Sequence, residues 1–168
     1  MLSRSRPQTP RFLSLTRFKG HPMTHAPSLD AFPFHARDKL RYSDTDQQGH
    51  LNNAVFATFF ETGRVEILYD PQRPVLPEGT FFVVARIAID FLAEVRWPGE
   101  IAIGTGVAGL GRSSIRLTQA LFQNGKPCAA AESVVVLMDA ATRRPAEIPP
   151  EMRERLSAYL VKAEDAGD

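Results

Sequence analysis

The chain has 168 residues, 43% of them hydrophobic, and a formal net charge of +1. This length gives room for one domain with a proper core and little more. Five of the 20 basic residues lie among the first 22 positions, which hold no acid, so the remainder carries 15 basic and 19 acidic residues, a net charge of −4. A mildly acidic body argues against nucleic acid as a partner.

The cysteine count and the hydropathy of the chain exclude disulfide-bonded, zinc-cluster and membrane-spanning proteins. The single cysteine, Cys128, rules out an intramolecular disulfide and a cysteine-based zinc cluster. It lies in the apolar run CAAAESVVVLM, where we expect a packed and inert thiol. No apolar run approaches the ~20 residues of a membrane span. We therefore expect a protein of a reducing compartment, the cytoplasm, with no membrane partner.

The chain is predicted to consist of a basic, disordered segment over residues 1–30 and a domain over residues 31–165. The segment begins MLSRSRPQTPRFLSLTRFKG, which is rich in serine and arginine and free of acids, as an organellar transit peptide would be. A disordered tail and a true start at Met23 explain the same composition. The sequence leaves these three interpretations open.

The first predicted elements are a strand over residues 34–43, a polar turn SDTDQQGH, and a long helix over residues 53–69. Apolar side chains follow helical spacing in this last stretch, and they are Val55, Phe56, Phe59, Phe60, Ile67 and Leu68. Such an apolar helix needs cover on most of its circumference. Three prolines and a glycine in the segment DPQRPVLPEG then end the helix.

Four strands are predicted next. In residues 80–92 every second residue from Phe81 to Phe91 is apolar and shares one face, whereas Arg86 and Asp90 point the other way. Further strands are expected over residues 100–109, over SSIRLTQALF and, after a tight Asn-Gly turn, over about 128–139. A Pro-Pro-Glu sequence opens a short C-terminal helix.

This order predicts an α+β fold in which one antiparallel sheet covers one buried helix. A single helix covers only one face of such a sheet. Open strand edges and the uncovered face favour pairing of copies, so we expect a homo-oligomer.

Two motifs match ligand-binding signatures in form only. Residues 104–109, GTGVAG, fit the dinucleotide fingerprint, but the residues that follow alternate like a strand where the fingerprint requires a helix. The glycines more simply permit a bulge or close backbone approach. Asp44 and Asp46 begin a calcium-loop pattern, but the twelfth position is Val55 instead of a bidentate acid. Neither ligand is expected.

The chemistry is expected in residues 41–64, RYSDTDQQGHLNNAVFATFFETGR. Here Asp46 lies in a turn directly before the helix, whose first N–H groups, near Asn52 and Asn53, lack intrahelical partners. A carboxylate beside such donors could act on a carbonyl whose oxygen becomes an oxyanion. Spacing alone explains Asp46 or Asn52 equally well as a helix cap. Glu61 and Arg64, one turn apart, are expected to form a structural ion pair.

The segment DTDQQGHLNNAVF, with ETGR after it on the helix, resembles the signature of the hotdog-fold acyl-CoA thioesterases. The resemblance is closest to the 4-hydroxybenzoyl-CoA thioesterase-like group. The pieces LGRSSI and TRRPAEIP lie where that family has similar sequence, so the resemblance covers roughly residues 34–160. It implies a hotdog fold: a five-stranded antiparallel sheet wrapped around a long central helix, with a short C-terminal helix.

The resemblance also implies roles for individual residues in hydrolysis of an acyl-CoA to free acid and CoA. Asp46 would be the general base or the nucleophile, and the main-chain N–H of Asn53 the oxyanion donor. Gly49 matches the turn glycine. Phe56 stands where the family has a tyrosine, so it is expected to form a pocket wall. A catalytic role is further expected for His50, and Gly49, Asn52 and Phe56 are expected to contact the substrate.

Partners follow from the same resemblance. It implies that the CoA channel is lined by Gly111, Arg112, Ser113 and Ser114, in a homodimer or a dimer of dimers whose site is completed by a neighbouring subunit. No metal or separate cofactor is expected, because CoA enters as part of the substrate. Two other functions stay open: a non-catalytic acyl-CoA-binding module, and a hotdog dehydratase that would use His50 with Asp46.

Overall fold

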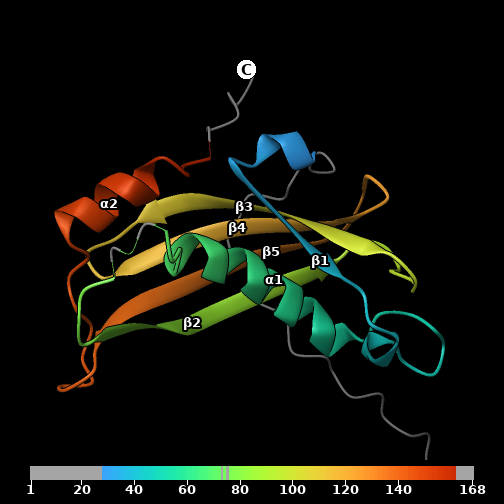
Figure 1. Ribbon diagram of the computed structural model, residues 1–168, viewed down its shortest axis with the longest axis horizontal. Coiled ribbons are helices and arrows are strands. Elements are labelled where there is room, and N and C mark those ends of the chain that lie inside the picture. Colours follow the sequence, from blue (N-terminus) through green and yellow to red (C-terminus); the bar gives the residue numbers. More distant parts are fainter. Residues whose placement is uncertain (1–27, 73, 75, 162–168) are drawn as a thin grey trace, which may run out of the picture.

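The computed structural model describes residues 28–72, 74 and 76–161, so most of the predicted N-terminal segment lies outside the described residues. Figure 1 shows a sheet with one long helix across it and a short helix at one end. The strands are β1 (Phe34–Lys39), β2 (Thr80–Phe91), β3 (Glu100–Leu110), β4 (Ser114–Gln123) and β5 (Lys126–Asp139). The helices are α1 (Asn53–Leu68) and α2 (Pro150–Ser157), and two short 3-10 helices span Leu29–Ala31 and Tyr42–Asp44.

The five strands form one antiparallel sheet in the order β1-β3-β4-β5-β2. Helix α1 lies across one face of the sheet, as Figure 1 shows, and buries its phenylalanines against β1, β3, β4 and β5. This is the predicted α+β arrangement. Among the described residues, no helix is long and apolar enough to cross a membrane.

Helix α1 lies close to the sheet because a glycine faces a buried polar cluster. A Cβ on Gly63 would lie 2.5 Å from Oγ1 of Thr105 and 3.0 Å from Nε2 of Gln119. That Nε2 donates to the main-chain oxygen of Phe60 at 2.9 Å and to Thr105 Oγ1 at 3.0 Å. The side-chain amide of Gln119 therefore joins the helix to the sheet.

The expected ion pair between Glu61 and Arg64 is wrong. Arg64 is only 6% exposed, and its Nη1 donates to Oε1 of Gln119 at 3.4 Å, whereas Glu61 stays on the exposed side of the helix. Burial lowers the pKa of the Arg64 guanidinium, and the negative charge of Glu61 acts in the opposite direction. Helical spacing alone therefore misplaced this side chain.

Two strand predictions also need correction. β1 ends at Lys39, not at residue 43, because the chain turns into a 3-10 helix in which the Arg41 N–H donates to the Asp44 carboxylate at 2.8 Å. β2 contains a β-bulge between Val84 and Arg86, which reverses the alternation. Phe81 therefore lies on the face opposite to that of the later apolar residues of β2, instead of sharing it.

The GTGVAG stretch lies inside β3 and leads into another strand, as expected. A Cβ on Gly104 would lie 2.4 Å from the Phe32 ring, and one on Gly106 would lie 2.3 Å from Val161. A bulge separates Val107 from Gly109 in the pairing with β4. Gly104 and Gly106 therefore let Phe32 and Val161 lie close against β3. Their place inside a strand is not that of a nucleotide-binding loop.

Candidate active site

The turn that carries Asp46 is closed by its own side chain. Oδ1 of Asp46 accepts the N–H groups of Gln48 at 2.8 Å and His50 at 3.2 Å, and the Asp46 N–H donates to the His50 oxygen at 2.8 Å. Gly49 takes a φ of +76°, a conformation that favours glycine. Asp46 Oδ2 has no hydrogen-bond partner among the described residues. One oxygen thus fixes the carboxylate and the other stays available.

The N-terminus of α1 begins beside this turn, and its cap is Asn52. The Asn52 side chain accepts the N–H of Ala54 at 3.0 Å, so the cap is Asn52 and not Asp46. The N–H of Asn53, the first residue of the helix, has no hydrogen-bond partner within the part of the chain that the structure describes. It is a free donor at the positive end of a 16-residue helix.

A pocket of about 420 Å³ joins the turn, the helix N-terminus and the end of β2. Its lining residues are Asp46, Gln48, His50, Leu51, Asn53, Phe56, Phe91, Leu92, Ala93, Glu94 and Val95. The volume suits a small-molecule ligand. The predicted residues Asp46, His50, Asn53 and Phe56 thus surround one space, which is lined by both apolar and polar side chains.

Phe56 forms part of the apolar wall. It is buried, and its ring meets that of Phe91 edge to face with the ring centres 5.0 Å apart. Phe91 and Leu92 are 52% and 50% exposed, so this wall extends to the protein surface along the edge strand β2. Phe56 thus lines the pocket with an apolar ring, and its role toward a substrate stays a prediction.

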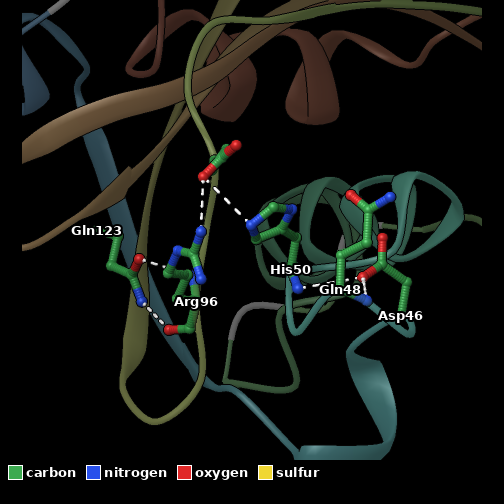
Figure 2. Close-up of polar contacts among 6 residues, drawn as sticks. Asp46, Gln48, His50, Arg96 and Gln123 are labelled. Atoms are coloured by element: carbon green, nitrogen blue, oxygen red, sulfur yellow. Dashed lines mark hydrogen bonds and ion pairs between the residues drawn. The ribbon is translucent and has the colours of Figure 1, made fainter.

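The histidine of the turn contacts an acid that the sequence did not point to. Nε2 of His50 lies 3.2 Å from Oε2 of Glu94, and the same oxygen lies 3.1 Å from Nη2 of Arg96. Figure 2 shows His50 between the Arg96 segment and the turn that bears Asp46 and Gln48. Glu94 was missed because it follows His50 by more than forty residues and no spacing pattern links the two.

The predicted CoA-channel residues lie elsewhere in this chain. Gly111, Arg112 and Ser113 form the turn between β3 and β4, and Ser114 is the first residue of β4. Arg112 Nε lies 3.2 Å from Oε2 of Glu147. The Asp46 pocket lies at the opposite end of the sheet: Phe91, which lines it, pairs with Ala129, and the ladder continues through Leu121 to Ile103 near the start of β3. Since β3 has 11 residues, the two regions are roughly 30 Å apart. Within one subunit they do not meet.

The pocket offers carboxylate, imidazole and amide groups but no clustered metal ligands. In residues 28–72, 74 and 76–161, no group of three or more His, Cys, Asp or Glu side chains is placed to hold a metal ion. Cys128 is buried as expected, and burial raises the pKa of its thiol. The arrangement favours chemistry at an electrophilic carbonyl carbon by Asp46, with an N–H donor for its oxygen.

Comparison with known proteins shows the family of the chain. Residues 40–156 match the family model described as the thioesterase-like superfamily. The chain is 26% identical over 115 residues to the acyl-CoA thioester hydrolase YbgC of Escherichia coli, an alignment that covers 66% of this chain and 86% of YbgC.

Solved structures agree as well. A thioesterase of Thermus thermophilus, solved with coenzyme A and Zn, is 35% identical in sequence, with a TM-score of 0.70. The superposition covers 80% of this chain and 99% of the Thermus chain. The protein PA5185 of Pseudomonas aeruginosa is 30% identical, with a TM-score of 0.75, and the superposition covers 83% of this chain and 100% of PA5185. The expected hotdog fold and thioesterase class are thereby confirmed. The chain belongs to the thioesterase-like superfamily.

Proposed function

We propose that this protein hydrolyses acyl-CoA thioesters to a free acid and CoA. The observation that carries the proposal is the meeting of Asp46 and the free Asn53 N–H in one pocket. Relatives named as acyl-CoA thioester hydrolases and a similar structure with coenzyme A bound support the choice of substrate class.

Asp46 acts on the thioester through its free oxygen. Because Oδ1 is held by the main-chain N–H groups of Gln48 and His50, the carboxylate keeps one orientation, with Oδ2 available to a water or to the thioester carbon. This fixed orientation lowers the entropic part of the barrier. General acid–base catalysis of this type contributes about 10²–10⁴ in rate.

The Asn53 N–H stabilises the carbonyl oxygen as it becomes an oxyanion. The helix dipole of α1 acts in the same direction, since its positive end faces the pocket. Loss of one such donor typically costs about 3 kcal/mol of barrier. Asn52 supports this donor indirectly, because its capping bond to Ala54 holds the first turn of the helix.

Two routes use the same geometry. Asp46 either takes a proton from the attacking water or attacks the carbonyl itself, forming a mixed anhydride and expelling the CoA thiolate. Single turnover in ¹⁸O-labelled water separates the routes: label in the Asp46 peptide identifies the nucleophilic route, and label only in the released acid favours general base catalysis.

The apolar wall sets the class of acyl group. Phe56, Phe91 and Leu92 line the pocket, so an aliphatic or aromatic acyl chain is favoured over a charged one. The tail is expected beside Phe91 and Leu92, which are exposed at the pocket end of β2.

We further propose that the active unit is a homodimer formed along β2. This strand is an open edge of 12 residues with exposed apolar side chains, which a second copy would cover. Two-fold antiparallel pairing of these edges brings the far end of the partner's sheet, with its residues 111–114, to the Asp46 pocket. Arg112 would then meet the CoA phosphates across the interface.

The dimer proposal has a complementation test. Arg112→Ala is expected to raise KM with little loss of kcat, and Asp46→Asn to abolish turnover. When the two variants are mixed and re-associated, one site of the mixed dimer combines the intact Asp46 of one chain with the intact Arg112 of the other. If each site is built from both chains, this site regains the wild-type KM. Activity that stays at the sum of the separate variants would contradict a shared site.

Release of CoA from a substrate panel tests the function itself. The panel spans short, medium and long fatty acyl-CoAs with benzoyl-, 4-hydroxybenzoyl- and phenylacetyl-CoA, and the released thiol is measured. We expect turnover of at least one apolar acyl-CoA. A folded protein that binds these compounds and releases no CoA would instead be an acyl-CoA-binding module.

A further inference from the structure

A second acid lies on the wall of the pocket, and the mechanism above gives it no task. Glu94 follows the end of β2 and lines the pocket with Asp46 and His50. It also lines a neighbouring cavity of about 180 Å³. Its carboxylate stands between a largely buried imidazole and an exposed guanidinium, with side-chain exposures of 21% for His50 and 61% for Arg96.

The imidazole nitrogen that faces Glu94 has no other partner. Nε2 of His50 is buried and makes no hydrogen bond in the described part of the chain. Oε2 of Glu94 lies 3.2 Å away in a charge contact that does not count as a hydrogen bond. A buried donor without an acceptor typically costs about 1–3 kcal/mol. Rotation of the Glu94 side chain, which is 63% exposed, would complete the hydrogen bond.

The segment around Glu94 is held firmly by the sheet and by the turn of the site. His50 and Arg96 pair as an antiparallel bridge, and the Leu51 N–H donates to the Val95 oxygen at 2.8 Å. The Gln123 side chain, shown in Figure 2, accepts the Arg96 N–H at 3.1 Å and donates to the Arg96 oxygen at 2.7 Å. Glu94 is therefore presented to His50 from a fixed backbone.

We propose that Glu94 is a positioning residue that keeps a proton on Nε2 of His50. A carboxylate beside Nε2 favours the tautomer with the proton on that nitrogen, which leaves Nδ1 as the proton acceptor. It also stabilises the imidazolium that forms when Nδ1 takes up a second proton. His50 thereby becomes a proton carrier whose charged form is balanced by Glu94.

The inference rests on the proposed function, in which His50 and Glu94 take part in the proton transfers of thioester hydrolysis. Along the general-base route, one O–H bond of water and the C–S bond break while a C–O bond forms. The water proton passes to Asp46 and from there to Nδ1 of His50. The sulfur leaves with the bonding electron pair as a thiolate and takes that proton. Glu94 acts only through His50 and does not touch the substrate.

The kinetic test is Glu94→Gln, which keeps the side-chain size and removes the charge. We expect kcat to fall about tenfold or more while KM stays within about twofold, since the change acts on a proton transfer worth about 10²–10⁴ in rate. The matched control is Glu100→Gln: Glu100 has the same side-chain exposure of 63%, pairs with Arg37 at 3.9 Å and does not line the pocket. Its kcat is expected to be unchanged.

A double-mutant cycle separates positioning from general damage to the fold. In a His50→Gln background, Glu94→Gln is expected to cause almost no further loss, because its effect passes through the imidazole. Equal losses in both backgrounds, or unchanged kcat in Glu94→Gln, would overturn the proposal.

The His50 tautomer gives a readout that does not depend on turnover. In ¹⁵N-histidine-labelled protein, long-range proton–nitrogen spectra are expected to show His50 protonated on Nε2 in the neutral form, with His50→Gln used for assignment. Glu94→Gln should raise the Nδ1-protonated fraction. An unchanged tautomer would contradict the inference, whereas wild-type protein without turnover on any thioester would contradict the proposed function instead.

Discussion

Substitution of Gln119 by leucine tests how helix α1 is held on the sheet, and with it the position of the active-site donor. Gln119 is 1% exposed and makes three hydrogen bonds, to the Phe60 oxygen, to Thr105 and from Arg64. Leucine has a similar size and makes none of them. The buried guanidinium of Arg64 then loses its recorded hydrogen-bond partner.

The magnitude follows from these three contacts. A hydrogen bond to a charged group contributes about 1.5–3 kcal/mol, and each of the neutral ones about 1 kcal/mol. The apolar surface that leucine buries offsets part of this sum, so we expect a net loss of about 3 kcal/mol in the free energy of unfolding. For a chain of 168 residues, this corresponds to a fall in Tm of roughly 6–12 °C.

Chemical denaturation at constant protein concentration measures this loss. The control is the double variant Arg64→Met with Gln119→Leu, which removes the buried charge as well and is expected to regain about half of the stability. A loss below about 1 kcal/mol for Gln119→Leu, or a double variant no more stable than the single one, would refute the account of this cluster.

Three further predictions concern the helix and the thiol. Asn52→Ala removes the cap of Ala54 and should lower the free energy of unfolding by about 1 kcal/mol in chemical denaturation, whereas Asn52→Asp should retain most of it. Gly63→Ala should lower Tm despite its better helix propensity, because the new Cβ meets Thr105; a higher Tm would contradict this packing. Native Cys128, buried and with a raised pKa, should react with Ellman's reagent only after unfolding; rapid native labelling would contradict its burial.

The order of helices and strands was predictable because the spacing of hydrophobic residues differs between a helix and a strand. Helical spacing gave residues 53–69 against the observed Asn53–Leu68, and period-two alternation gave the four later strands to within a few residues. The pattern failed in β2, where a bulge between Val84 and Arg86 shifts the alternation. A bulge adds one residue without changing composition, so hydrophobicity does not reveal it.

The sequence indicated those residues of the candidate site that lie close together along the chain. Asp46 and Asn53 lie seven positions apart in one turn and one helix start, and the structure places both on the same pocket. Glu94 reaches His50 only through strand pairing, which a single sequence does not encode as spacing. Arg64 was misplaced for a similar reason: its partner, Gln119, comes from β4.

The central claim is that Asp46 performs the chemistry, and the most direct test compares Asp46→Asn with the wild type on the acyl-CoA that is cleaved fastest. The asparagine oxygen can still accept the Gln48 and His50 N–H groups, so the turn and the Tm should be preserved. We predict that kcat falls by a hundredfold or more, equivalent to about 3 kcal/mol of barrier. A folded Asp46→Asn variant that releases CoA within tenfold of the wild-type rate would place the catalytic group on another residue.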